Sequence, residues 1–452
     1  MIRTGLAASL LLAALCSAYP SASAEAPAAT AVALTATGGA ASEGDEAAAV
    51  VRQRRPPAPA KSAVNAYADI DLGVQTRSFA ERGFAGQDRF QASMSMRFEY
   101  HRSWDDDRSS VTATPFVRID GQDDERTHAD LRELFWTRVG DVWEIHVGAR
   151  QIFWGVTEFS HLVDIVNQTD LVENIDGEDK LGQPMVQLSL VRGWGIVDLF
   201  AMSGFRERTF PGEDGRLRSV LPVDTDRARY VSGAGRGRVD GAVRWSHHLG
   251  PVSFGIYHFS GTGRDPQFVP EIHDGELVLV PEYHVIDQTG LDAQAIVGDW
   301  AWKLEALTRS GQGDRYHAYT AGFERTLVGV SGSRSDLGLV VEYMYDQRDE
   351  AAFDNLFEHD VAFGTRWQLN DLADTTALAG IIWDVDTDEY VFTLEASRRL
   401  GASWQAELEG RIFGGADGID AGTHPLVPPD DDIRSRALQN DDYIQLELTR
   451  YF

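Results

Sequence analysis

FQASMSMRFEYHR, residues 90–102, alternates between apolar and polar side chains. The even-numbered positions from Phe90 to Tyr100 are apolar or aromatic, and the odd-numbered positions from Gln91 to His101 are polar or charged. Because successive side chains of a β-strand point to opposite faces, the stretch predicts a strand with one apolar and one polar face. Its length, roughly ten residues, is that of a tilted strand that crosses a membrane.

The same alternation recurs along the chain. Charged side chains stand in the middle of its polar face, as at Lys303, Glu305 and Glu395, which suits strands that line a water-filled lumen. A soluble β-sandwich or solenoid is the alternative. Other alternating segments lie at 66–74, 302–306, 361–367, 390–396 and 443–449.

Short connections alternate with long ones between these segments. Outer-membrane barrels show the same alternation, with short periplasmic turns and long outer loops. Eight of the eleven tryptophans stand near a short connection, where an indole ring would lie at the level of the lipid headgroups. Those tryptophans are Trp104, Trp143, Trp194, Trp245, Trp300, Trp302, Trp367 and Trp404. The short connections are 140–142, 193–194, 248–251, 298–299 and 400–403, and the long ones are roughly 154–183, 205–236, 263–281 and 414–440.

In these features the chain resembles bacterial outer-membrane β-barrels of the porin-like kind. We therefore predict an all-β fold, a transmembrane antiparallel β-barrel of about 18 strands that begins near Ala66 and ends at Phe452. Sixteen strands is the alternative, because the alternation is unclear at 252–262 and 277–297. The resemblance places the protein in the outer membrane of a Gram-negative bacterium, with both termini periplasmic.

The last strand carries a further resemblance, because such barrels end on a strand that closes with phenylalanine and is read by the barrel-assembly machinery. The residues that match this signal are Ile444, Leu446, Leu448 and Phe452. Arg450 departs from it, since that position is usually apolar or aromatic. The expected partners are therefore the assembly machinery, outer-membrane lipid and lipopolysaccharide, while homo-oligomerisation is left open.

Residues 1–24 have the form of a secretory signal peptide, with Arg3, an apolar run and Ala22-Ser23-Ala24 before the cleavage point. Residues 25–62 are rich in alanine and proline and predict a flexible periplasmic extension, with a folded plug as the alternative. Residues 63–452 then form the barrel. Cys16 is the only cysteine and falls in the signal peptide, so the mature chain has no disulfide.

The composition makes nucleic acid an unlikely partner, because a phosphate-binding face should be basic. The formal charge is −29, and removal of Arg3 makes it −30. No run of 18 apolar residues follows the signal, which argues against a transmembrane helix.

The strongest candidate for a pore constriction is VGARQIFWGVTEFSHLVDIVNQTDLVENIDGEDKLGQPMV, residues 147–186. Its long connection, about 154–183, is so long that we expect it to have a role. It would either fold into the lumen or brace the wall. The candidate residues are Arg150, Trp154, Asp164, Asn167, Asp170, Glu178 and Asp179.

The pattern Arg150-Gln151-x-x-Trp154-Gly155 and then Asp164-x-x-Asn167-x-x-Asp170 resembles a poorly characterised proteobacterial porin-like family. That family more often has Asn-Pro-x-Asp where this chain has Asn167-Gln168-Thr169-Asp170. The resemblance implies a barrel of similar plan and a link to the transport of apolar compounds. From the residues alone, Asp164 and Asp170 could cap turns or accept hydrogen bonds from Arg150.

Residues 204–238 are the one basic island, with eight arginines against five acidic residues. The candidates there for an arginine ladder across the pore are Arg206, Arg208, Arg216 and Arg218. The alternative is that these arginines pair with neighbouring acids or with lipopolysaccharide phosphate.

Enzymatic motifs and cofactor motifs are lacking, so we predict neither a catalytic site nor a cofactor. No metal site is predicted either: Asp384, Asp386 and Asp388 imitate the start of a calcium loop, but Glu389 stands where its turn needs glycine. The predicted function is passive diffusion of small solutes. The alternatives are a selective conduit for hydrophobic or carboxylated compounds and a non-conducting envelope anchor or adhesin. Acidic residues outnumber basic ones at lumen-phase positions, which predicts a preference for cations.

Overall fold

The computed structural model describes residues 65–348, 357–415 and 438–452. Residues Ala63–Phe452 form one compact unit. The predicted signal peptide and the predicted periplasmic extension lie outside the described residues and remain predictions.

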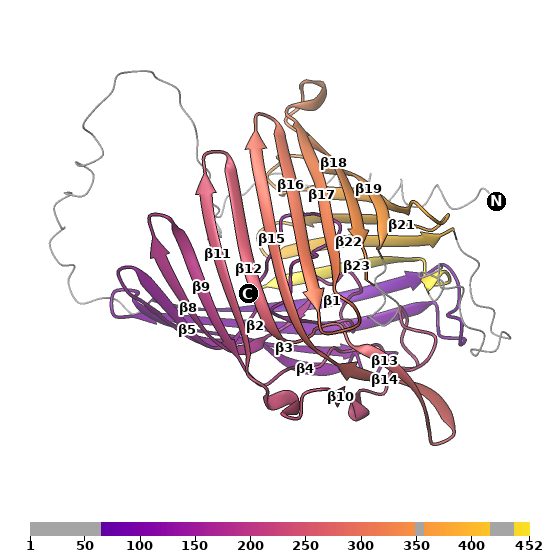
Figure 1. The fold of residues 1–452 in the computed structure, drawn as a ribbon. Coiled ribbons are helices and arrows are strands. Elements are labelled where there is room, and N and C mark those ends of the chain that lie inside the picture. Colours follow the sequence, from indigo (N-terminus) through magenta and orange to yellow (C-terminus); the bar gives the residue numbers. More distant parts are fainter. Residues whose placement is uncertain (1–64, 349–356, 416–437) are drawn as a thin grey trace, which may run out of the picture. The chain divides into compact units, whose positions relative to one another are not determined.

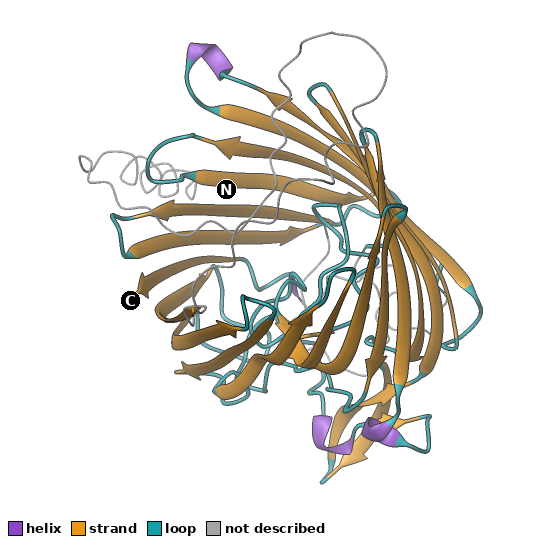
Figure 2. Cartoon of the chain, turned by 90° about the vertical axis from the view of Figure 1, so that its left-hand side faces the viewer, coloured by secondary structure: helices purple, strands orange, loops and turns teal. Residues whose placement is uncertain are grey.

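Eighteen antiparallel strands form a single closed ring (Figures 1 and 2). Each strand pairs with its neighbours in chain order, and the ring closes where the last strand pairs with the first, with Val74 opposite Leu448. Closure leaves no sheet edge with unpaired backbone groups, which is the condition for a sheet to cross a lipid bilayer. The fold is therefore an 18-stranded transmembrane antiparallel β-barrel, and the alternative count of sixteen is wrong.

The first nine strands of the wall are β1 (Asn65–Phe79), β2 (Phe90–Trp104), β3 (Ser109–Asp120), β4 (His128–Val139), β5 (Trp143–Arg150), β8 (Gln183–Arg192), β9 (Gly195–Met202), β11 (Asp240–Leu249) and β12 (Val252–Thr262). The other nine are β15 (Val285–Val297), β16 (Trp300–Ser310), β17 (Tyr316–Leu327), β18 (Asp336–Asp346), β19 (His359–Gln368), β20 (Thr376–Asp384), β21 (Tyr390–Arg399), β22 (Trp404–Gly414) and β23 (Tyr443–Tyr451).

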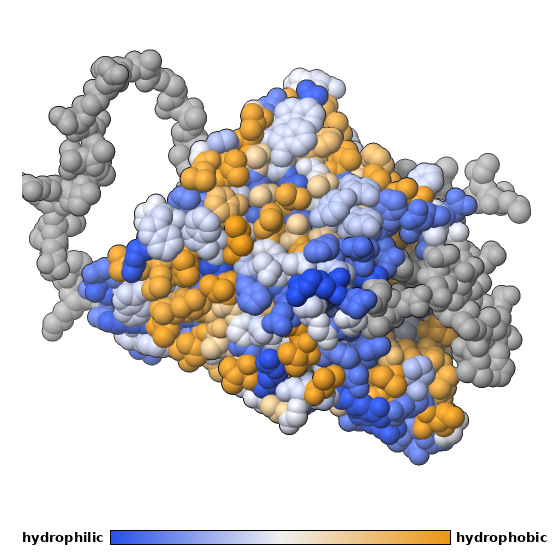
Figure 3. Space-filling view, in the orientation of Figure 1, coloured by the Kyte–Doolittle hydropathy of each residue, from blue (hydrophilic) through white to orange (hydrophobic). Residues whose placement is uncertain are grey.

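The predicted facing of the strands is confirmed in β2. Phe90 and Met94 are 52% and 64% exposed on the outer face, whereas Gln91 and Ser93 are each 4% exposed on the inner face. Apolar side chains cover much of the wall seen in Figure 3. An outer face of this kind is buried by lipid, because a charge placed there at the bilayer midplane costs roughly 2–4 kcal/mol.

The five short connections expected from the sequence and both ends of the barrel chain lie at one end of the wall, called here the short-turn end. The four long connections expected from the sequence join strands at the other end. Strand β1 begins opposite the end of β2, with Asn65 facing Ser103. Trp194 and Trp302, both near short connections, are exposed. Tryptophans placed in this way can form one aromatic belt at a membrane surface.

The unclear alternation at 277–297 has a structural cause, whereas 252–262 is a regular strand of the wall, β12. A hairpin of β13 (Gln267–His273) and β14 (Glu276–Tyr283) leaves the wall here and pairs with β10 (Arg229–Tyr230) in a separate small sheet. The wall resumes at Val285, so residues 277–284 do not belong to the lipid-facing wall. The remaining elements are β6 (Gln168–Thr169), β7 (Lys180–Leu181) and the 3-10 turns η2 (Thr225–Arg227), η3 (Gly235–Gly237) and η4 (Val330–Gly332). Within the described residues, no helix is long and apolar enough to span a bilayer.

Candidate functional site

Residues 151–182, which join β5 to β8 and are called here the crossing segment, are held by two carboxylates on distant strands. Glu305 of β16 accepts hydrogen bonds from the backbone N–H groups of Val156 and Thr157 at 2.6 and 2.9 Å. Glu342 of β18 accepts from the N–H groups of Glu158 and Phe159 at 2.7 and 2.9 Å. Loop segments lie inside the ring of strands in Figure 2.

The second half of the crossing segment contacts other strands. The Asn174 amide donates to Glu409 of β22 at 3.1 Å, and Asp176 pairs with Arg411 of the same strand at 3.1 Å. Since β5, β16, β18 and β22 are spread around the ring, the segment passes across the lumen between them.

One side of the lumen is filled by apolar packing. Trp154, Val163, Ile165 and Val166 of the crossing segment form a buried cluster with side chains from β8, β9, β11, β12 and β15. The wall residues of this cluster are Met185, Phe200, Met202, Ala242, Tyr257, Phe259 and Ile286. Each large apolar side chain so buried contributes about 1.5–3 kcal/mol, so this packing fixes the segment against that side of the wall.

Two cavities lie on either side of the crossing segment. One, of about 830 Å³ and called here the seam cavity, is lined by β1–β4, by β19–β23 and by the segment, Glu173 among its residues. The other, of about 690 Å³, lies toward the long connections and is lined by His128, Asp170 and residues of 206–213. The part of the segment from Asp170 to Glu173 therefore stands between the two.

Buried ion pairs hold this part of the segment. Arg132 of β4 contacts Asp170 at 2.6 Å, and Arg118 of β3 contacts Glu173 at 2.7 Å. Burial opposes ionisation of Glu173, but Arg118, Arg126 and Arg132 hold its pKa below the ordinary value. Breaking such a buried pair by removing one partner costs about 3–5 kcal/mol.

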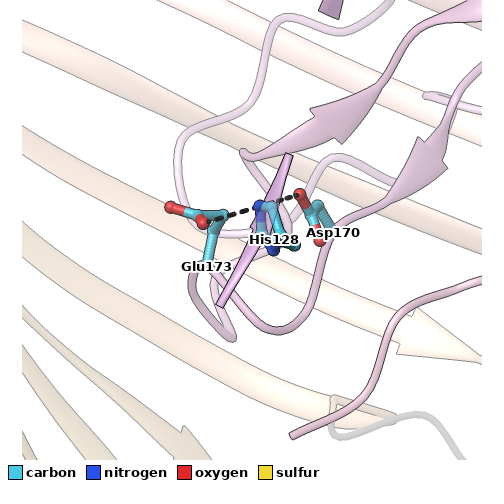
Figure 4. Close-up of side chains that lie close together, drawn as sticks. All are labelled: His128, Asp170 and Glu173. Carbon is cyan, nitrogen blue, oxygen red and sulfur yellow. Dashed lines mark ion pairs between the residues drawn. The ribbon is translucent and has the colours of Figure 1, made fainter. Parts of the chain in front are cut away.

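His128, Asp170 and Glu173 lie close enough to offer three ligand atoms to one ion (Figure 4). His128 Nε2 is 3.2 Å from Glu173 and 4.0 Å from Asp170. However, Arg118 and Arg132 already contact these two carboxylates, and a guanidinium group there competes with a cation for the same oxygen atoms. The cluster is therefore better described as an ion-pair network than as a metal centre.

Four of the candidate residues lie together at the base of the crossing segment. The Asn167 amide donates to the backbone oxygens of Arg150 and Leu181 at 2.7 and 2.8 Å, and its oxygen accepts from the N–H of Ile152. Trp154 packs on Phe200 and Tyr257. Asp164 pairs with Lys180 at 3.2 Å and accepts from the N–H of Trp154.

The expected contact of Arg150 with Asp164 or Asp170 does not form. The Arg150 guanidinium donates to Gln187 and lies over the Phe135 ring instead. The motif residues thus lie near the place where the crossing segment leaves β5 and returns to β8. Two other candidates, Glu178 and Asp179, line the seam cavity.

The four candidates of the basic island are dispersed. Arg206 pairs with Asp130 at 2.6 Å and Arg208 with Asp265 at 2.7 Å, and both arginines line the cavity near the long connections. Arg216 is buried with Asp441 at 2.6 Å. The Arg218 guanidinium lies over the ring of Phe84. These pairs hold loops together and do not make a ladder across the pore.

Sequence reasoning missed the residues that position the crossing segment, above all Arg118, Arg132 and Glu342. Each has the inward phase of its strand, so the available signal was a charged residue at an inward-facing position. Their partners lie 38 to 184 residues away in the chain, and the alternation says nothing about such distant pairs.

No model of a known protein family matches the chain, and no curated protein matches its sequence. Among solved structures it is similar to OpdO of Pseudomonas aeruginosa, with 10% identity over 86% of this chain and 96% of that chain and a TM-score of 0.49. It is also similar to a BenF-like porin of Pseudomonas fluorescens Pf-5, with 8% identity, coverage of 86% and 98%, and a TM-score of 0.47. A third is Wzi of Escherichia coli, an outer membrane protein of capsule assembly described as a carbohydrate-binding β-barrel, with 7% identity, 84% coverage of each chain and a TM-score of 0.48. At such low identity the function has to be argued from this chain's own residues.

Proposed function

We propose that this protein is a passive diffusion channel for small hydrophilic solutes in the outer membrane of a Gram-negative bacterium. The observation that carries the proposal is the seam cavity, a polar space of about 830 Å³ inside a closed barrel with an apolar outer face. A water-filled lumen lets solutes cross without entering lipid, and a charged lining keeps that space wet.

In this proposal the short-turn end faces the periplasm and the long connections face outward. The arrangement follows the general plan of outer-membrane barrels, with short periplasmic turns and longer external loops. Lipid and lipopolysaccharide then surround the wall, and the crossing segment acts as the constriction. The barrel-assembly machinery would read the last strand, β23.

A conduit for hydrophobic compounds has less support in the described residues. The apolar side chains of the cluster around Trp154 are packed against one another, as Phe259 and Ile286 show with 0% exposure, and this cluster offers an apolar solute no exposed surface. The non-conducting anchor has more support, because the ion pairs at Asp170 and Glu173 stand between the two cavities. Conductance distinguishes a channel from an anchor.

The test is liposome swelling by the full-length mature protein, with arabinose as the permeating sugar. Gly73 lines the seam cavity, and its neighbour Val74 is exposed on the outer face. We expect Gly73→Trp to slow swelling strongly, because the indole ring would occupy the cavity, and Val74→Trp to leave it unchanged. Heat-modifiable mobility on gels shows that each variant is folded. Absence of swelling with folded wild-type protein would exclude the channel and leave the anchor.

A further inference from the structure

We infer that the solute path is off-axis, along the seam where the first and last strands pair, and that Glu395, Glu407, Glu409 and Glu447 make it a filter for small cations. The inference rests on the proposed channel function and names its substrate class: inorganic cations and small protonated amines.

The position of the path follows from which strands carry open space. Among the described residues, the seam cavity is lined by β1–β4, β19–β23 and the crossing segment, and by none of β5 to β18. On the other side the lumen is filled. The apolar cluster covers β8–β15, and Glu305 of β16, Thr320 of β17 and Glu342 of β18 are at most 1% exposed beneath the segment.

This geometry divides the acidic residues of the wall into two groups. Asp240, Asp292 and Glu305 are buried on the filled side and have partners there. Asp292 pairs with Arg244 at 2.6 Å, and Asp240 pairs with Arg238 at 3.1 Å. These three carboxylates are buried and do not line the seam cavity, so selectivity falls to the seam side.

Carboxylates dominate the lining of the seam cavity, with ten carboxylate side chains against four arginines. Arg411 stands beside them and contacts Asp176, Glu395 and Glu409 at 3.0–3.5 Å. Even with Arg411 counted, acidic groups outnumber basic ones two to one. A cleft lined by one sign of charge with low-dielectric walls concentrates counter-ions.

The register of the wall adds a second observation. Glu395 lies directly opposite Glu409, and Glu407 lies directly opposite Glu447. Like charges at directly opposed positions destabilise a sheet. Glu407 and Glu447 accept hydrogen bonds from Gln405 and Gln75, which are neutral donors, and neither carboxylate forms an ion pair within the described residues. A mobile cation in the cavity supplies the missing counter-charge.

The test is the reversal potential across a planar bilayer that separates two concentrations of KCl. For wild type we expect K⁺ to be preferred over Cl⁻ by about tenfold at low salt, and less at high salt because screening shortens the reach of the charges. The double variant Glu407→Gln with Glu447→Gln should lose most of this preference. Charge reversal by Glu407→Lys should lower the preference for K⁺ over Cl⁻ still further.

The matched control is Asp141→Asn with Asp299→Asn, which removes two charges from exposed short turns at the same end of the barrel. This control should keep the wild-type preference. If the control and the glutamine variant shift equally, or if wild type prefers anions, the filter is overturned and the channel stands. If folded wild-type protein gives no conductance, the proposed function itself fails.

Discussion

Glu305 on β16 accepts a hydrogen bond at 2.9 Å from the backbone N–H of Thr157, 148 residues earlier in the chain. The same carboxylate also accepts from the N–H groups of Val156 and Val163, and its side chain has no exposed surface. Bonds to an ionised acceptor are roughly twice as strong as neutral ones. One wall residue therefore fixes the stretch from Val156 to Val163 of the crossing segment against the filled side of the lumen.

Removal of this anchor should loosen the crossing segment without unfolding the barrel. Glu305→Ala leaves buried N–H groups without an acceptor, each at a cost of about 1–3 kcal/mol. We expect faster proteolysis within 151–182 and larger current fluctuations. Glu99→Ala is the control, because Glu99 accepts from Tyr67 on the neighbouring strand. Equal protease sensitivity of wild type and Glu305→Ala would show that the anchor does not hold the segment.

Adjacent substitutions on β2 test the facing of the wall. Met96 is 45% exposed on the outer face near the middle of the strand, and Ser95 lines the seam cavity. Met96→Arg should lower the free energy of unfolding in lipid by roughly 2–4 kcal/mol, whereas Ser95→Arg places its charge in water beside carboxylates and should cost little. Chemical unfolding in vesicles measures both. A larger loss for Ser95→Arg would mean a register error of one residue.

The C-terminal residue should matter for assembly. The N–H of Phe452 donates to the backbone oxygen of Ile70 at 3.0 Å, and the guanidinium of Arg450 lies 4.4 Å from the centre of its ring. Arg450, which departs from the expected assembly signal, thus covers one face of the Phe452 ring. We expect Phe452→Ala to reduce the folded fraction sharply in cells, as reported by heat-modifiable mobility. The control is Tyr451→Ala, and a folded fraction at the wild-type level in Phe452→Ala would argue against the assembly signal.

Acid should weaken the contact between the crossing segment and β3. The pKa of Glu173 is depressed by its arginine partners, so its contribution to stability is complete above the unfolded value of about 4.3 and is lost as pH falls through the lower folded value. Glu173→Gln should be less stable than wild type at neutral pH and should lose less stability between about pH 5 and about pH 3. The midpoint of the heat-induced mobility shift measures this. If the midpoint falls equally with pH in wild type and in Glu173→Gln, Glu173 is not the acid-sensitive group.

The wall could be predicted from the sequence because its signal is local. Alternation within one strand, as at Met94 and Ser95, reports facing directly, and an even strand count follows from a barrel with both chain ends on the same side. The site could not be predicted in the same way. Whether Glu305 lines water or holds a loop depends on Thr157, far away in the chain, and on apolar packing around Trp154 that has no periodic pattern. Charge counts along the wall therefore could not separate carboxylates that line the seam cavity, such as Glu395, from carboxylates buried on the filled side, such as Glu305.

Chemical modification of single cysteines during current recording tests the off-axis path most directly. Cys16, the one cysteine of the sequence, falls in the predicted signal peptide, so an introduced cysteine would be the only thiol of the mature protein. Ser95→Cys lies in the seam cavity, and Thr320→Cys lies on the filled side, where Thr320 is 1% exposed. We predict that methanethiosulfonate ethylammonium reduces the current through Ser95→Cys and leaves Thr320→Cys unchanged. Block of Thr320→Cys without block of Ser95→Cys would contradict a path along the seam.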